Sequence, residues 1–264
     1  MKIPILMYHA ISDEPADAVR TLSVRPGMFA AQLALLRAEN FTPLTFTGLA
    51  RALRNGDALP ERPIVLTFDD GYADFHREAL PLLTRYGFPA TVFVTTGWVA
   101  DAGADAAGKP LDRMLTWSQI DEVHSAGIEI AAHSHSHPQL DQLASAPLKH
   151  ELRISKTQLE DRLGREVPTL AYPYGYSSAR VRDAVQTAGY RHAAVVANAI
   201  AGAGGEPLAL PRLTIRRSTT LQTFRRIVHG DGIARVFLAD RALTKGWAVV
   251  RRSQYAAAKI CGRV

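Results

Sequence analysis

The sequence predicts an α/β fold in which parallel strands alternate with helices within one domain. Three observations predict it: short apolar runs recur along the chain, segments with helical periodicity separate them, and several of these helical segments stop at a glycine. At 264 residues, of which 47% are hydrophobic, the chain can bury a sizeable core without disulfides. Its single cysteine, Cys261, fits a reducing compartment.

The expected strands are short apolar runs bounded by proline, glycine or polar residues. The clearest is residues 64–68, which Pro63 precedes and Gly71 follows, as is typical of a fully buried parallel strand. In chain order, we expect strands at residues 3–7, 64–68, 90–94, 128–132, 170–172, 193–196 and 213–215.

The expected helices show apolar residues at helical spacing, as Phe29, Leu33 and Leu36 do. Pro147 suits the first turn of one helix, and Gly164 suits its end. In chain order, we expect helices at residues 29–36, 49–53, 75–86, 117–125, 148–163 and 181–188, with a surface loop at residues 100–109.

Polar residues follow the expected strands repeatedly. His9, the pair Asp69 and Asp70, residues 133–137 and residues 172–174 each come directly after one of them. In parallel α/β folds, the ligand site forms where the strands end at their carboxyl edge. We therefore expect these residues to converge on one site.

The segment Thr67-Phe68-Asp69-Asp70-Gly71 places two adjacent carboxylates at the end of an apolar run. Burying such carboxylates costs free energy unless a positive group lies beside them. Successive side chains of extended backbone point in different directions, so the two carboxylates can serve different roles. One can bind a metal ion while the other acts as a base toward the substrate. The alternative is an ordinary Asp-Asp-Gly turn on the surface.

Three histidines, His133, His135 and His137, follow another expected strand. Histidines four residues apart share one face of a helical turn, and histidines two apart share one face of extended backbone. A lone histidine is more often an ordinary core or surface residue, but this density at a strand end favours metal binding. Two imidazoles and one aspartate form a three-ligand site with open positions, which suits zinc or a similar divalent cation in a hydrolase.

Three motifs resemble those of the polysaccharide deacetylases of carbohydrate esterase family four, which share the NodB-homology domain. In chain order they are Thr67-Phe68-Asp69-Asp70-Gly71, His133-Ser-x-x-His137-Pro138 and Tyr172-Pro173-Tyr174-Gly175. The likeness covers about the first 215 residues. It implies a distorted (β/α)7-type barrel in which Asp69 is the catalytic base and Asp70, His133 and His137 hold the metal ion. The implied cofactor is a divalent cation, zinc first, with Co²⁺, Ni²⁺ or Fe²⁺ as alternatives.

The resemblance also assigns a role to the third motif. Tyr174 would offer its backbone N–H to the oxyanion, and Tyr172 and Pro173 would contact the substrate together with it. His135 has no counterpart with a role in the family.

The sequence departs from the family pattern at two points. The third motif usually opens with an arginine that pairs with the base, but Ala171 stands there, and Arg212 is our candidate replacement. The family's last motif is an aliphatic strand that ends in a histidine, whereas His229 lies in a basic stretch without clear periodicity. The segment Ile5 to His9 does match that description, so we expect the barrel-closing strand at the N-terminus, with His9 as general acid. The alternative is that His9 only forms hydrogen bonds within the barrel.

This arrangement resembles the branch that deacetylates poly-N-acetylglucosamine. The expected reaction is metal-dependent hydrolysis of N-acetyl groups on an amino-sugar-containing glycan, with an aspartate base. Two alternatives stay open: a carbohydrate-binding pseudo-enzyme on the same fold, and a hydrolase that acts on O-acetyl esters or cyclic amides.

The net charge of +6 is concentrated at the C-terminus. Six of the 31 basic residues and no acidic ones lie in residues 241–264, which leaves 25 basic against 25 acidic residues in the rest of the chain. A neutral body argues against a nucleic-acid enzyme. We expect a barrel over residues 1–235 and a basic helical tail over residues 236–264, either solvated or in peripheral contact with a membrane or a partner protein.

The first residues contain an apolar run that is short and interrupted by His9. Such a run is too short for a signal peptide core or a membrane span. The expectation is a cytoplasmic protein, with the inner membrane surface as an alternative location.

Overall fold

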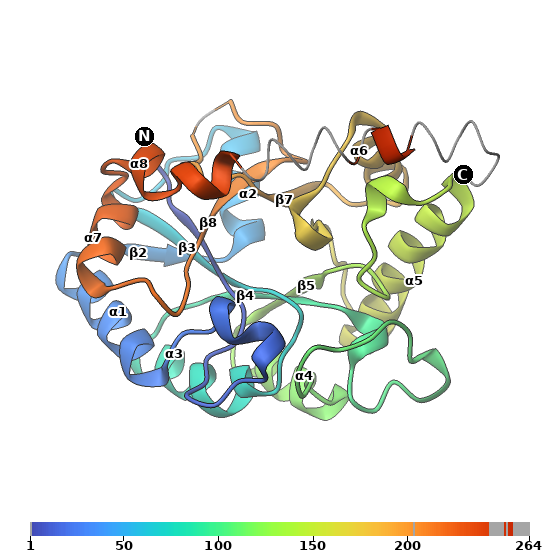
Figure 1. Ribbon diagram of the computed structural model, residues 1–264, viewed down its shortest axis with the longest axis horizontal. Helices are drawn as coiled ribbons and strands as arrows, with labels where there is room; N and C mark the ends of the chain where they lie inside the picture. Colours follow the sequence, from blue (N-terminus) through green and yellow to red (C-terminus); the bar gives the residue numbers. More distant parts are fainter. Residues whose placement is uncertain (1, 203, 243–250, 252, 256–264) are drawn as a thin grey trace.

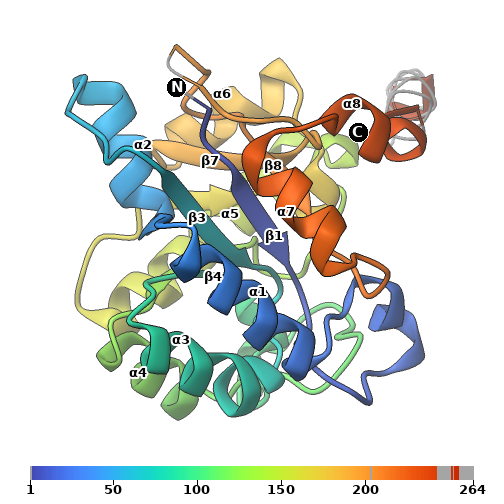
Figure 2. The same cartoon turned by 90° about the vertical axis from the view of Figure 1, so that its left-hand side faces the viewer.

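The structure, a computed structural model, describes residues 2–202, 204–242, 251 and 253–255. Within these residues, seven parallel strands close into a barrel. In order around the ring they are β1 (Ile5–Tyr8), β8 (Leu210–Thr214), β7 (His192–Val196), β6 (Thr169–Ala171), β5 (Glu129–Ala132), β4 (Thr91–Val94) and β3 (Pro63–Phe68). β1 pairs with both β8 and β3 and so completes the ring (Figure 2). The predicted barrel is confirmed, and so is its closure by the N-terminal strand.

Helices surround the ring of strands (Figure 1). In chain order they are α1 (Pro26–Ala38), α2 (Phe46–Asn55), α3 (Leu80–Tyr86), α4 (Trp117–Ser125), α5 (Ser145–Leu163), α6 (Ala179–Thr187), α7 (Leu221–His229) and α8 (Ile233–Val236). Local chemistry sets their ends. Thr116 and Gln119 form a capping box at the start of α4. Gly87 and Gly164 adopt the left-handed conformation that ends α3 and α5.

Alternate residues of the strands fall into two apolar clusters. Leu6 and Leu66 belong to the larger cluster, which packs the strands against the helices, whereas Ile5 and Val65 belong to a smaller one. Because successive strand residues point to opposite faces, the smaller cluster lies inside the barrel. Phe46 at the start of α2 joins this inner cluster. The barrel is therefore a packed core rather than a channel.

Two of the elements that were not predicted bear on the sequence interpretation. β2 (Thr42–Leu44) is a three-residue strand that pairs with the start of β3, and Pro43 in its middle obscures its pattern. The second is α7, where the sequence appeared basic and without periodicity. That interpretation is wrong, because Phe224, Ile227 and Val228 form one buried stripe while arginines occupy the exposed face.

Much of the predicted basic tail, residues 243–250, 252 and 256–264, lies outside the described residues. Residues 238–242 are helical, and Phe237 is buried in the larger apolar cluster. In the described part of the chain, no helix combines the length and the apolar character needed to cross a bilayer.

Candidate active site

The two carboxylates at the end of β3 are buried and point apart. The Asp69 N–H donates to the Tyr8 carbonyl oxygen at 3.0 Å, which extends the pairing of β3 with β1 by one residue. Asp70 then turns into the left-handed region with φ of 75°. This change of backbone direction sends the Asp69 side chain toward Arg212 and the Asp70 side chain toward two histidines. The predicted divergence of the two carboxylates is confirmed.

Asp70, His133 and His137 form one compact cluster. Each offers a ligand atom that lies within 4.8 Å of the others. Asp70 Oδ1 lies 3.4 Å from His133 Nε2 and 3.3 Å from His137 Nε2. Within the described residues this buried oxygen has no hydrogen-bond partner of good geometry. Three acceptor atoms that face one another in a buried place repel unless a positive charge lies between them.

The tautomer of His133 follows from its second nitrogen. His133 Nδ1 lies 2.9 Å from the Ala171 carbonyl oxygen, which can only accept, so Nδ1 carries the proton and donates it. The Nε2 atom therefore faces Asp70. Burial by itself lowers the pKa of His133, but the charges of Asp69 and Asp70 outweigh burial and raise it. This part of the cluster favours a positive charge.

His137 reaches the cluster from a tight loop. Ser134 and His137 both adopt left-handed backbone, with φ of 63° and 61°, and the His137 N–H donates to Ser134 Oγ at 3.1 Å. The ring of Trp98 lies 4.8 Å from the His137 ring, centroid to centroid. Burial lowers the pKa of His137 to about 4, so its imidazole is neutral near pH 7. A neutral imidazole is the form that binds metal ions.

Asp70 itself is held as a carboxylate. Burial raises its pKa, but the neighbouring imidazoles of His133, His137 and His9 outweigh burial and hold that pKa well below its ordinary value. An ionised oxygen therefore faces the two ring nitrogens.

Arg212 of β8 supplies the cation that the sequence lacks at position 171. Its side chain is fully buried and grips both carboxylate oxygens of Asp69, at 2.5 Å from Nη1 and 2.8 Å from Nη2. Nη1 also donates to Thr67 Oγ1 at 3.1 Å. Burial alone raises the pKa of Asp69, but the charge and hydrogen bonds of Arg212, together with the charges of His133 and His9, outweigh burial and lower it. Asp69 is therefore ionised and fixed in orientation at the edge of the cluster of Asp70, His133 and His137, with Oδ2 at 3.9 Å from His133 Nε2.

His9 lies at the same edge, directly after β1. Its Nδ1 is buried and has no hydrogen-bond partner among the described residues. The charges of Asp70, Asp69, Arg212 and His133 all act on it, which places it beside the cluster. Burial outweighs the two carboxylates and lowers the pKa of His9, so the ring is neutral near pH 7.

The third motif forms a strained turn over the cluster. Tyr174 has φ of 58° and ψ of 1°, and its ring is half exposed and lies 4.8 Å from the His137 ring. The turn's backbone hydrogen bonds come from the N–H groups of Gly175 and Tyr176, and among the described residues the Tyr174 N–H donates to no backbone carbonyl of the turn. A Cβ at Gly175 would lie 2.4 Å from Val196 Cβ, so only glycine fits where this turn crosses β7. Non-glycine residues with left-handed backbone gather at functional sites because the surroundings must hold them there.

Two of the predicted substrate-contacting residues have a different place. Tyr172 is fully buried and its hydroxyl donates to the Leu208 carbonyl oxygen at 2.9 Å, and Pro173 is also buried. Of the three residues, Tyr174 alone presents its side chain at the surface. The sequence alone does not show whether an aromatic residue in a motif packs in the core or contacts a ligand.

Sequence reasoning predicted Tyr174 in the site but missed Tyr176 and Arg251 at its rim. Tyr174 and Tyr176 stack with ring centroids 5.9 Å apart, and we call them the rim tyrosines. The Arg251 guanidinium lies 3.1 Å from the ring centroid of Tyr176, and its Nε bonds to Asp141 Oδ2 at 2.9 Å. The described part of the C-terminal segment thus lies beside α6 and the rim, as Figure 1 shows. Only the tertiary fold brings residue 251 to this place.

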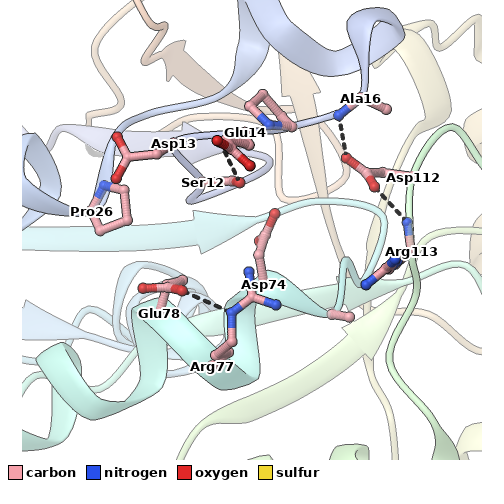
Figure 3. Close-up of a pocket in the computed structure, with 12 residues that line it drawn as sticks. Ser12, Asp13, Glu14, Ala16, Pro26, Asp74, Arg77, Glu78, Asp112 and Arg113 are labelled. Atoms are coloured by element: carbon pink, nitrogen blue, oxygen red, sulfur yellow. Dashed lines mark hydrogen bonds and ion pairs between the residues drawn. The ribbon is translucent and has the colours of Figure 1, made fainter.

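Beside the cluster, rather than at it, lies a hollow of about 620 Å³ (Figure 3). Carboxylates and two arginines line it, and Asp74 points into it from the turn after β3. Asp70, His133 and His137 do not line this hollow. Burial raises the pKa of Asp74 to about 6, although the Ile11 N–H donates to its Oδ1 at 3.0 Å.

Comparison with known proteins agrees with the motifs. The family model for polysaccharide deacetylases matches residues 56–193. A relative from Escherichia coli (strain K12), named poly-beta-1,6-N-acetyl-D-glucosamine N-deacetylase, is 27% identical over 253 residues, which cover 83% of this chain and 37% of that protein. The chain therefore spans little more than a third of that relative's length.

Two solved structures share the fold. The Streptococcus pyogenes deacetylase PplD, in complex with acetate, is 29% identical with a TM-score of 0.77, over 86% of this chain and 98% of that one. The Bacillus cereus polysaccharide deacetylase BC0361 is 28% identical with a TM-score of 0.73, over 86% of this chain and 69% of that one. Because the family model matches more than half of the residues and includes the first two motifs, this chain belongs to the polysaccharide deacetylase family.

Proposed function

We propose that this chain is a metal-dependent hydrolase that removes N-acetyl groups from an amino-sugar-containing glycan. One observation carries the proposal: Asp69, ionised and oriented by the buried Arg212, lies at the edge of a cluster of three potential metal ligands. A protein that only binds sugars has no need of a buried carboxylate held in this way, since burying it costs free energy.

The donor set fits a divalent cation. Asp70, His133 and His137 would hold it, because their ligand atoms converge and the buried Asp70 Oδ1 has no partner of good geometry within the described residues. A carboxylate with two imidazoles suits Zn²⁺ first, and Co²⁺, Ni²⁺ or Fe²⁺ after it. When bound, such a cation polarises water and the acetyl carbonyl group.

Asp69 is our candidate for the base that takes a proton from the attacking water. Arg212 lowers the pKa of Asp69 and fixes both oxygens, so the carboxylate is ready to accept that proton at neutral pH. The amine needs one proton as the C–N bond breaks. We assign its delivery to His9, which burial keeps neutral and which must first receive the proton that left the water. The proton count then balances without an external acid.

The developing negative charge on the acetyl oxygen needs a hydrogen-bond donor. The Tyr174 N–H is our candidate because the strained turn holds it near His137 and, among the described residues, the turn's own backbone hydrogen bonds do not use it. One such preorganised donor typically contributes about 3 kcal/mol to transition-state stabilisation. The half-exposed ring of Tyr174 offers an apolar face on which a sugar ring can stack.

The substrate class rests on the acetamide chemistry and on the relatives. The name of the Escherichia coli relative describes an N-deacetylase of poly-β-1,6-N-acetylglucosamine. We extend that class, an N-acetylated amino-sugar polymer, to this chain.

The test is release of acetate from N-acetylglucosamine oligomers, with and without a chelator, beside O-acetylated sugars as competitors. Asp69→Asn should bind metal as the wild type does yet release no acetate, whereas His133→Ala should lose both properties. Metal-dependent release from O-acetylated sugars alone would replace the proposal with esterase activity. Oligomer binding with no acetate release under any metal would replace it with the pseudo-enzyme.

We further propose the division into a barrel over residues 1–235 and a basic extension over residues 236–264. Its support is the charge of the extension, which carries six basic and no acidic residues from position 241 onward. If this charge brings the extension into peripheral contact with a membrane, the chain should co-sediment with anionic vesicles more than with neutral ones. Equal binding to the two kinds of vesicle would contradict a contact that depends on charge.

A further inference from the structure

A buried carboxylate interrupts the apolar stripe of α5. The buried face of this helix consists of Leu148, Glu151, Leu152, Ser155 and Leu159. Glu151 is 8% exposed, and among the described residues no lysine or arginine forms an ion pair with it. A charge in such a position is costly unless hydrogen bonds satisfy it.

Among the described residues, the hydrogen bonds of Glu151 come from the loop between the two histidines of the cluster. Oε2 accepts from the N–H of His135 at 2.9 Å and from the N–H of Ser136 at 2.8 Å. Oε1 accepts from the Ser136 hydroxyl at 2.5 Å. Two successive backbone N–H groups thus converge on one carboxylate oxygen, an arrangement of the kind that holds anions in proteins.

The restrained residues come directly before His137. Because both Ser134 and His137 have left-handed backbone, this loop is intrinsically strained and has to be held from outside. Gly97 also holds it by donating its N–H to the His135 carbonyl oxygen at 2.8 Å. Glu151 acts on the opposite side of the same peptide chain, on its N–H groups.

We propose that Glu151 is a positioning residue of the metal-binding cluster: it fixes the loop so that His137 Nε2 faces Asp70 Oδ1 at 3.3 Å. This inference rests on the proposed function, because it gives Glu151 the role of positioning His137, one of the three proposed metal ligands. The alternative is a purely structural role, in which Glu151 only fastens α5 to the barrel.

Divalent metal binding by the intact chain separates these roles. Metal is first removed from the wild type and from three variants, Glu151→Ala, Glu151→Gln and Ser136→Ala. Each protein is then titrated with Co²⁺ and with Zn²⁺, and its thermal unfolding is recorded separately in the absence of metal. The matched control is Glu160→Ala on the same helix, which removes a carboxylate that accepts from the Val167 N–H at 2.9 Å and pairs with Lys156. Glu160 lies far along α5 from the loop, so its loss affects only the fold.

Glu151→Ala should bind both metals about 10- to 100-fold more weakly than the wild type and should change the visible spectrum of bound Co²⁺. Glu151→Gln keeps a carbonyl acceptor for the two N–H groups and should recover part of the affinity. Ser136→Ala loses one bond and should weaken binding only slightly. Glu160→Ala should lower the unfolding temperature with unchanged metal affinity.

Two results overturn the inference, and they differ. If Glu151→Ala binds Co²⁺ with wild-type affinity and spectrum, Glu151 is structural and the proposed function stands. Should Glu151→Ala not fold, the same result for both Glu151→Gln and Ser136→Ala leads to the same conclusion. If the wild type binds neither metal, the proposed function fails and the inference fails with it.

Discussion

The ion pair of Arg212 with Asp69 allows the sharpest prediction. Both side chains are almost completely buried, at 0% and 3% exposed, and two hydrogen bonds join them. Arg212→Met fills similar space but leaves Asp69 without its cation, and removal of one partner of a buried pair typically costs about 3–5 kcal/mol. The carboxylate also loses its orientation, and a misplaced catalytic group typically costs about 100-fold in turnover.

The matched control is Arg162→Met, which breaks a pair of the same two-pronged geometry with Asp121 at the surface. There the side chains are 41% and 43% exposed, so water replaces the lost contacts and the cost should stay below about 1 kcal/mol. Urea unfolding in metal-free buffer gives both free energies, and acetate release gives turnover. Equal losses of unfolding free energy in the two variants would refute the argument from burial.

Three further predictions follow from other parts of the site. Asp74→Asn should flatten the dependence of stability on pH. Because the pKa of Asp74 in the folded protein is raised to about 6, wild-type stability falls as pH rises from about 4 to about 6, and at pH 7.5 the variant should be more stable by up to about 3 kcal/mol. If urea unfolding gives the same difference in free energy between wild type and variant at pH 4 and at pH 7.5, this prediction is contradicted. Gly175→Ala should cost more stability than Gly56→Ala, because both have left-handed backbone but the new Cβ meets Val196 at 2.4 Å only at position 175, and comparable melting temperatures would show that the turn yields. Arg251→Ala should raise KM for N-acetylglucosamine oligomers about two- to five-fold with kcat retained, because the guanidinium stacks on Tyr176, which in turn stacks on Tyr174. Steady-state kinetics that show a lower kcat and an unchanged KM would place Arg251 elsewhere in the reaction.

The sequence predicted the parts of the site that strand ends determine. Parallel strands share one carboxyl edge, so His9, Asp69 and His133 had to meet once the strands were correctly identified. Arg212 was predictable for a related reason, since a buried carboxylate requires a cation and this arginine directly precedes the strand expected at residues 213–215, which in the structure is β8 and includes it. Local periodicity and burial costs are both visible in a single sequence.

Contacts that depend on loops and on distant packing were not predictable in this way. Glu151 did leave a signal, a charge in the apolar stripe of α5, but the loop it holds is known only from the fold. Trp98 lies against His137 and Arg251 against Tyr176 through contacts between segments far apart in the chain, which local periodicity does not reveal. Tyr172 shows the converse error, because an aromatic residue inside a motif was expected at the substrate and instead packs in the core.

The seam at β1 has a consequence for how the protein is made. Leu6 pairs with Leu213, so the first strand waits unpartnered on one side until nearly the whole barrel sequence has left the ribosome. Contacts so distant along the chain form late and slowly during folding. Arg212 lies in β8 on one side of this seam, so its ion pair with Asp69 forms only once β8 has joined the barrel.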